Sequence, residues 1–141
     1  MPSTSDPYRA GPGRWTGLDT LAALCVVGTV PSIPMTLDLE AGFPGGGFLF
    51  ALALLSLPFP ALALLARPLR SRVLRRVAGA AMLVLLALWW WAFRDAYMVP
   101  ANSDPQNALI FVVMPLYGTG AAALLGVALR LLDRRMAPPG R

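Results

Sequence analysis

Four apolar stretches, each long enough to cross a lipid bilayer, constrain this chain more than any other feature of its sequence. A membrane-spanning helix needs about 20 mostly apolar residues, and such stretches cover residues 15–36, 47–66, 77–97 and 108–132. The connections between them are short, so sequential helices should be antiparallel neighbours. The sequence therefore predicts an all-α integral membrane protein, an antiparallel bundle of four transmembrane helices.

Composition excludes the two main alternatives to a membrane protein. Hydrophobic residues make up 57% of the 141 residues and charged residues only 13%, whereas an average soluble domain is about 45–50% apolar and about 25% charged. A chain with so few polar groups cannot cover a water-facing surface, and a disordered chain needs low hydrophobicity. We therefore expect neither a soluble domain nor a disordered chain.

The placement of arginine predicts how the four helices are oriented. All twelve bases are arginine, as is typical of GC-rich bacterial genomes, and eleven fall on one side of a four-span arrangement. Basic residues accumulate in cytoplasmic loops. We therefore expect a multi-pass protein of the inner (plasma) membrane, with a cytoplasmic arm (1–14), a transmembrane domain (15–132) and a cytoplasmic tail (133–141). Five arginines between the second and third stretches determine this topology: Arg67, Arg70, Arg72, Arg75 and Arg76.

The same arginines indicate what the cytoplasmic face contacts. Attraction to anionic lipid headgroups follows from them directly, at about 1 kcal/mol per base near the surface. Nucleic acid is not an expected partner, because no aromatic residues are interleaved with the bases. Asp19, at the cytoplasmic start of the first stretch, can pair with Arg14 or with an arginine of the connection.

Histidine and cysteine exclude several chemistries. The chain has no histidine and a single cysteine, Cys25, which lies within the first stretch. Without histidine and with one cysteine, the chain cannot form an intramolecular disulfide, a histidine-ligated haem site or the common zinc sites. It also cannot form a Ser-His-Asp or Cys-His catalytic arrangement. We expect no cofactor and no metal site, and Cys25 should pack as a small hydrophobic side chain.

Five charged residues are expected on the outer side of the membrane, where they form a candidate outer charged cluster: Asp38, Glu40, Arg94, Asp95 and Asp104. Arg94 is the only base on that side, so an acidic partner should neutralise it locally. One interpretation is a structural ion pair between the two outer loops. The other is a charged vestibule that selects an ion or an anionic substrate. The spacing of the acids matches no calcium-binding loop.

Prolines within the apolar stretches predict helix kinks at five positions: Pro31, Pro34, Pro58, Pro60 and Pro115. Each internal proline removes a backbone hydrogen bond and tends to kink the helix. Pro58 and Pro60 together could free carbonyls near the bilayer centre, which is how some transporters coordinate cations. A kinked structural helix is the simpler interpretation, because proline is common in membrane helices and Ser56 can satisfy part of the loss.

Small residues and tryptophans give two predictions about packing. A stripe at four-residue spacing lets two helix backbones approach closely, and its residues are Gly118, Ala122 and Gly126. Its partner could be a helix of this chain or of another subunit.

Three consecutive tryptophans, residues 89–91, point in three directions about 100° apart, so they cannot all face one ligand. We expect an interfacial belt, with one of the three lining a pocket as the alternative.

These features support three hypotheses about function. The first is a non-enzymatic accessory or structural subunit that packs through the stripe, as a homo-oligomer or in a larger membrane complex. The second is a small oligomeric transporter or channel with an outer charged vestibule around Arg94. The third, and the least supported, is a membrane enzyme acting on lipids, since catalysis requires preorganised groups and the first outer loop is rich in glycine.

Overall fold

A computed structural model describes residues 16–33, 52–97 and 110–136 of the chain. Within these ranges the regular structure is entirely helical, and a short helical segment, residues 52–56, precedes the second of the four main helices. The prediction of an all-α fold with four helices is confirmed for the described residues. The helices are α1 (Gly17–Thr29), α4 (Pro58–Ala66), α5 (Arg72–Tyr97) and α6 (Ile110–Met136).

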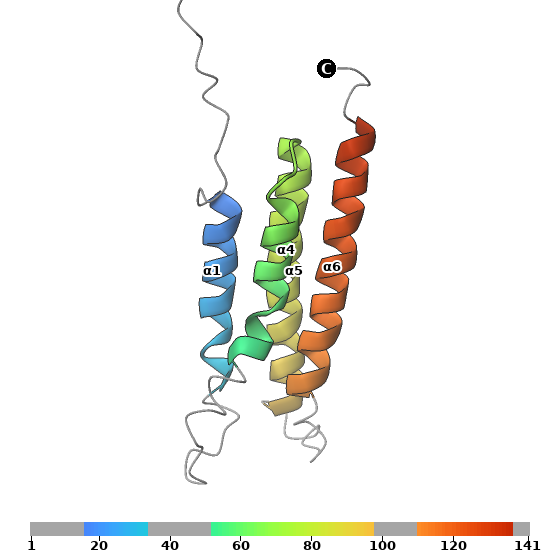
Figure 1. Cartoon of the computed structure of the whole chain (residues 1–141). Helices are drawn as coiled ribbons and strands as arrows, with labels where there is room; N and C mark the ends of the chain where they lie inside the picture. The colour runs from blue at the N-terminus through green and yellow to red at the C-terminus, as the bar shows by residue number, and fades with distance from the viewer. Residues whose placement is uncertain (1–15, 34–51, 98–109, 137–141) are drawn as a thin grey trace, which may run out of the picture.

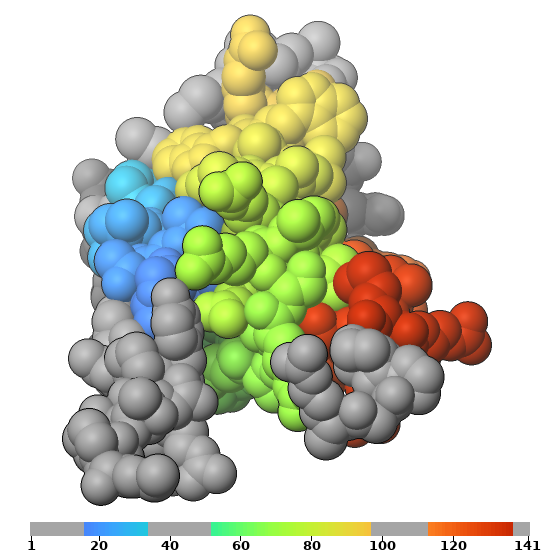
Figure 2. Space-filling model, turned by 90° about the horizontal axis from the view of Figure 1, so that it is seen from above, coloured from blue at the N-terminus to red at the C-terminus, as the bar shows by residue number. Residues whose placement is uncertain are grey.

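The four helices run in alternating directions. In Figure 1 the beginning of α1, the connection between α4 and α5 and the end of α6 lie together at the top. Seen from that end, α1 and α6 lie on opposite sides of the molecule, with α4 and α5 between them (Figure 2). Each outer helix contacts both inner helices, and the inner two contact each other. The result is a four-helix bundle in which α1 and α6 lie on opposite sides and α6 is an outer helix.

In the described part of the chain, two helices are long and apolar enough to cross a membrane, namely α5 with 26 residues and α6 with 27. At 1.5 Å per residue each is about 40 Å long, more than the hydrocarbon thickness of about 30 Å. The shorter helices α1 and α4 have 13 and 9 residues. Residues 15, 34–36 and 47–51 of the first two predicted stretches, which include Pro34, fall outside the described residues.

The ends of α5 and α6 extend beyond the apolar stretches that predicted them. Helix α5 begins at Arg72, before residue 77, and α6 ends at Met136, beyond residue 132. Arginine and leucine are good helix formers, so the helices continue through the charged turns. An apolar stretch therefore predicts where a helix can lie in a membrane but not where the helix ends.

The core lies where α4 meets the other three helices. Leu62 and Ala66 of α4 are fully buried, together with Met82 of α5 and Ala122 of α6. Cys25 of α1 joins the same cluster with 1% of its surface exposed, in the role expected of a small apolar side chain. Small residues from every helix keep the four backbones close at this level.

The small-residue stripe of α6 lies against α4 of the same chain. A Cβ atom at Gly118 would lie 3.3 Å from Cγ of Pro58, and a Cβ atom at Gly126 would lie 2.6 Å from Cβ of Leu65. Real Cβ atoms essentially never approach another atom as closely as the second distance, so a larger residue at position 126 would force α4 or α6 to shift. Ala122, between them, is 1% exposed.

Pro31 lies in the turn that follows α1, and the other described candidate kinks lie at a bend or beside a hydroxyl group. Pro58 and Pro60 lie in the first turn of α4, where a missing N–H costs little, after a turn at Leu57. Figure 1 shows the change of direction between residues 52–56 and α4. Pro115 lies inside α6, where the hydroxyl of Thr119 donates to the Pro115 carbonyl at 2.7 Å.

Candidate functional site

Charged side chains gather at one end of the bundle, which we call the arginine-rich end. It comprises the beginning of α1, residues 67–76 and the end of α6, which Figure 1 places together. The five arginines predicted to determine the topology, two in the α4–α5 connection and three in the first turns of α5, therefore lie at the same end as three from α6. Together they account for eight of the nine described arginines: Arg67, Arg70, Arg72, Arg75, Arg76, Arg130, Arg134 and Arg135.

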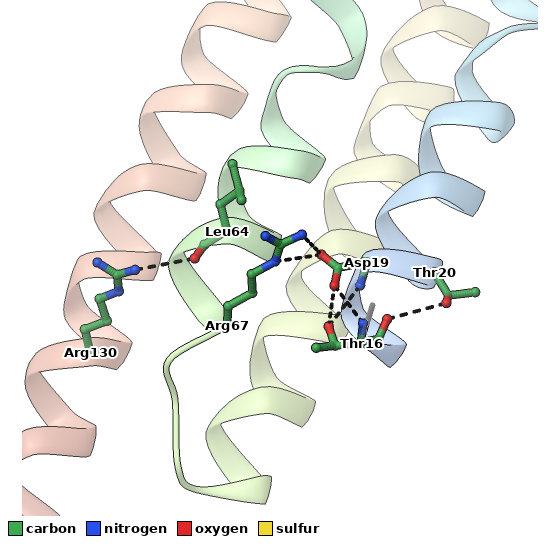
Figure 3. A network of polar contacts seen from close by, with 6 residues as sticks. All are labelled: Thr16, Asp19, Thr20, Leu64, Arg67 and Arg130. Carbon is green, nitrogen blue, oxygen red and sulfur yellow. Dashed lines mark hydrogen bonds and ion pairs between the residues drawn. The ribbon is translucent and has the colours of Figure 1, made fainter. Parts of the chain in front are cut away.

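Asp19 is the buried charge of the arginine-rich end. Its Oδ2 accepts hydrogen bonds from the N–H and the hydroxyl of Thr16 at 2.8 and 2.7 Å, as part of the capping box that begins α1. Its Oδ1 accepts from Nε and Nη2 of Arg67 at 3.1 and 2.9 Å (Figure 3). Both carboxylate oxygens are thus satisfied although Asp19 is only 7% exposed, and the ion pair ties α1 to the end of α4.

Arg130 of the neighbouring helix α6 donates hydrogen bonds to backbone carbonyls at the end of α4. In an α-helix each carbonyl accepts a hydrogen bond from the N–H four residues later. Pro68 has no N–H, so the carbonyl of Leu64 has no backbone donor. The N–H of Leu69 donates to a carbonyl other than that of Leu65, so the Leu65 carbonyl also has no backbone donor. The guanidinium of Arg130 donates from Nε to Leu65 at 2.7 Å and from Nη2 to Leu64 at 3.4 Å; Figure 3 draws the second of these. A cation is also favoured at a helix C-terminus by the helix dipole.

Asp133 caps the beginning of α5 from the end of α6. Its Oδ2 accepts from the N–H of Arg70 at 2.9 Å and its Oδ1 from the N–H of Ser71 at 3.0 Å. The hydroxyl of Ser71 accepts from the N–H of Leu74 at 3.5 Å, as an N-cap residue does. An anion at this position is stabilised by the α5 dipole, so Asp133 holds the α4–α5 connection against α6.

An open polar pocket of about 450 Å³ lies between the α4–α5 connection and the end of α6. Three arginines and one aspartate line it together with two apolar residues: Arg70, Arg130, Arg134, Asp133, Pro68 and Leu69. The carboxylate oxygens already accept from the backbone, as described above. The pocket therefore carries an excess of positive charge with hydrogen-bond donors, an arrangement suited to an anion.

The outer charged cluster lies only partly within the described residues. Arg94 and Asp95 are both exposed in the last turn of α5, at the opposite end from the other described arginines. The remaining members of the cluster, Asp38, Glu40 and Asp104, fall outside the described residues. Among the described residues, no group of three or more cysteine or acidic side chains is placed to hold a metal ion.

Two of the three consecutive tryptophans bond to the end of α1. The indole N–H of Trp90 donates to the Gly28 carbonyl at 3.0 Å, and that of Trp89 donates to the Ser32 hydroxyl at 3.2 Å. Trp91 is 67% exposed, so the three rings do point in different directions. The indoles of Trp89 and Trp90 thus satisfy polar groups where α1 ends, which hydropathy alone does not reveal.

A second pocket, of about 230 Å³, lies between the helices toward the opposite end. Apolar side chains dominate its lining, and no charged side chain of the described residues is among them. Pro58, Trp89, Pro115 and Tyr117 all line it, so one tryptophan of the three does face a pocket. Such a lining suits an apolar group better than an ion.

The sequence pattern assigns no individual role to Arg130 or Asp133. Two local signals were available. Pro68 predicts unsatisfied carbonyls at the end of a helix, and Ser71 is a good N-cap residue for the next one. Both signals indicate that partners are needed, but only the arrangement of α6 beside α4 and α5 identifies Arg130 and Asp133 as those partners.

The chain matches no protein-family model, no curated protein and no solved structure. Its function is therefore inferred from its own geometry and chemistry.

Proposed function

We propose that this chain is a four-span protein of a bacterial inner membrane, with its arginine-rich end and both termini on the cytoplasmic side. Two observations support the proposal. The helices alternate in direction, so the beginning of α1 and the end of α6 lie at the same end (Figure 1). Eight of the nine described arginines lie at that end, as the positive-inside rule requires of a cytoplasmic face.

Large apolar side chains on the outside of every helix support insertion in lipid. Leu24 is 63% exposed on α1, Leu64 is 52% exposed on α4, and Val84 is 57% exposed on α5. A soluble monomer rarely exposes a contiguous apolar patch larger than a few hundred Å². In a bilayer the same side chains contact acyl chains, so their exposure carries no hydrophobic penalty.

Within the membrane, we propose that the chain acts as a non-enzymatic accessory or structural subunit that packs laterally against a partner helix, from a second copy or from a larger complex. The observation that carries the proposal is the outward face of α6. The small-residue face of this outer helix is already filled by α4. Its opposite face exposes 76% of Tyr117 and 75% of Leu124, and a Cβ atom at Gly120 would meet no atom within 4 Å. A notch flanked by large side chains is typical of contacts between membrane helices.

The test is the assembly state of tagged protein in mild detergent, measured by native mass spectrometry. Wild type should appear as an oligomer or with a stoichiometric partner. Gly120→Leu fills the notch without touching the bundle, so it should release the partner. Ala87→Leu, which introduces the same side chain at an exposed position of α5, should not. A wild-type monomer without a partner, or equal release by both variants, would overturn the proposal.

The transporter hypothesis has less support. It depends on the outer charged cluster, three of whose five residues lie outside the described part of the chain, and the described pocket nearest that end has an apolar lining.

A further inference from the structure

The polar pocket at the arginine-rich end has the size and the charge of a binding site. Its volume of about 450 Å³ lies within the range of about 300–1,000 Å³ that is usual for small-molecule sites. Two segments far apart in the sequence build it, residues 68–70 and the last turns of α6. The hydrogen bonds from the N–H groups of Arg70 and Ser71 to Asp133 hold these segments together, so the pocket is a consequence of the fold.

The charged residues that line the pocket differ in how many of their hydrogen-bonding groups already have partners. Asp133, the only acid among the lining residues, directs both oxygens to backbone N–H groups. Arg130 uses Nε and Nη2 for the carbonyls of α4, which leaves its Nη1 group available. The side chains of Arg70 and Arg134 form no ion pair or hydrogen bond with other side chains in residues 16–33, 52–97 or 110–136. Guanidinium donors from two segments therefore remain available around one open space.

The chemistry of these donors selects the ligand. A guanidinium group donates two parallel hydrogen bonds to a phosphate, with planar geometry and a permanent charge. Arg130 lies in the last turn of the apolar stretch that ends at residue 132, and the other lining residues lie beyond that stretch or before the one that begins at residue 77. That level corresponds to the headgroups of the cytoplasmic leaflet if the chain spans the membrane as proposed. Basic pockets between membrane helices on this side bind anionic headgroups.

We propose that Arg70, Arg130 and Arg134 form a binding site for a phosphate group, and that an anionic phospholipid headgroup supplies it. The proposal rests on the membrane insertion proposed above. It differs from general attraction to an anionic surface because it assigns binding to three particular arginines rather than to net charge. Arg75, Arg76 and Arg135 contribute to the surface potential but do not line the pocket.

The experiment compares two double variants that remove the same charge. In Arg70→Gln/Arg134→Gln both arginines line the pocket, and in Arg76→Gln/Arg135→Gln neither does. The full chain is reconstituted in vesicles of phosphatidylglycerol and phosphatidylcholine with identical acyl chains, and insertion is measured by flotation and resistance to carbonate extraction. The protein is then extracted, and the lipids that it retains are identified by native mass spectrometry. Helix content from circular dichroism verifies that each variant is folded.

Wild type should retain phosphatidylglycerol in preference to phosphatidylcholine. The pocket variant should bind it at least about tenfold more weakly, because each lost charged hydrogen bond accounts for roughly that factor. The matched control should stay within about twofold of wild type. Equal losses in both variants, or no preference between the lipids, would overturn the proposal while leaving membrane insertion intact. Failure to insert would instead overturn the proposed membrane function.

A separate arm distinguishes the source of the phosphate. Inorganic phosphate is titrated against the detergent-solubilised protein with phosphatidylglycerol bound. Displacement of the lipid only at phosphate concentrations far above those of the lipid supports a headgroup site. Binding of inorganic phosphate without retention of phosphatidylglycerol would assign the pocket to a soluble anion and overturn the lipid source.

Discussion

The polar residues at the arginine-rich end have unequal energetic roles, because their exposure differs. Asp19 is 7% exposed, whereas the side chain of its partner Arg67 is 45% exposed. If the pair is broken from the arginine side, a buried carboxylate loses its counter-ion. If it is broken from the aspartate side, the arginine can be hydrated. Removing one partner of a buried pair is destabilising chiefly through the charge that is left behind.

We therefore predict that Arg67→Gln destabilises the bundle by about 2 kcal/mol, and that Asp19→Asn costs less, since the asparagine Oδ1 can still accept from the N–H of the N-cap residue Thr16. Thermal unfolding in detergent, followed by circular dichroism, measures both changes. The double variant should be more stable than the sum of the single effects predicts. Strict additivity, or a larger loss for Asp19→Asn, would argue against the pair as described.

Arg130 gives a second prediction at the same scale. Arg130→Met keeps an apolar stem but removes the donors that satisfy the Leu64 and Leu65 carbonyls. We expect a loss of about 1–2 kcal/mol in stability. Arg135→Met, which removes an exposed arginine of the same helix, should change stability by less than about 0.5 kcal/mol. Similar losses in the two variants would indicate a general charge effect instead of a cap.

Helix α6 has two faces with opposite requirements. The face that contains Gly118 and Gly126 packs against α4, and the face that contains Gly120 is open. The same substitution should therefore have opposite consequences on the two faces. Gly126→Ala places a methyl group 2.6 Å from Cβ of Leu65, so α4 and α6 must separate.

We predict that Gly126→Ala destabilises the bundle by about 1–3 kcal/mol through overpacking. Gly120→Ala should be neutral or stabilise it by up to about 1 kcal/mol, because alanine favours the helix more than glycine does. The thermal unfolding midpoints of the two variants in the same detergent give the comparison. If Gly126→Ala unfolds no earlier than wild type, the close approach of α4 and α6 is incorrect.

The sequence predicted the helices far better than the contacts between them. Apolar stretches and arginine clusters are properties of single segments, so they predicted four helices with a common arginine-rich end. The contacts of Asp19, Arg130 and Asp133 join residues that are 48 to 66 positions apart. The stripe at Gly118 and Gly126 predicted a close helix contact but not its partner, because small residues do not encode which helix they meet. The partner, α4, follows only from the order of helices in the bundle.

At the scale of the whole molecule, two surfaces of the bundle are available for interactions. Helices α4 and α5 lie between α1 and α6 (Figure 2), so α6 packs on the bundle with one face and exposes the other. The arginine-rich end combines interhelical contacts with a pocket whose arginines still have hydrogen-bond donors available. The proposed roles of both surfaces, lateral packing on α6 and phosphate binding at the arginine-rich end, depend on the same orientation in the membrane.

That orientation is tested most directly by labelling with a membrane-impermeant maleimide. Cys25 is 1% exposed, and its replacement by alanine gives a cysteine-free background in which Ser71→Cys and Asn102→Cys each introduce one site. In right-side-out membrane vesicles Asn102→Cys should be labelled and Ser71→Cys should not, and inverted vesicles should reverse the pattern. Labelling of Ser71→Cys in right-side-out vesicles, or of both sites in both preparations, would contradict a four-span protein with a cytoplasmic arginine-rich end.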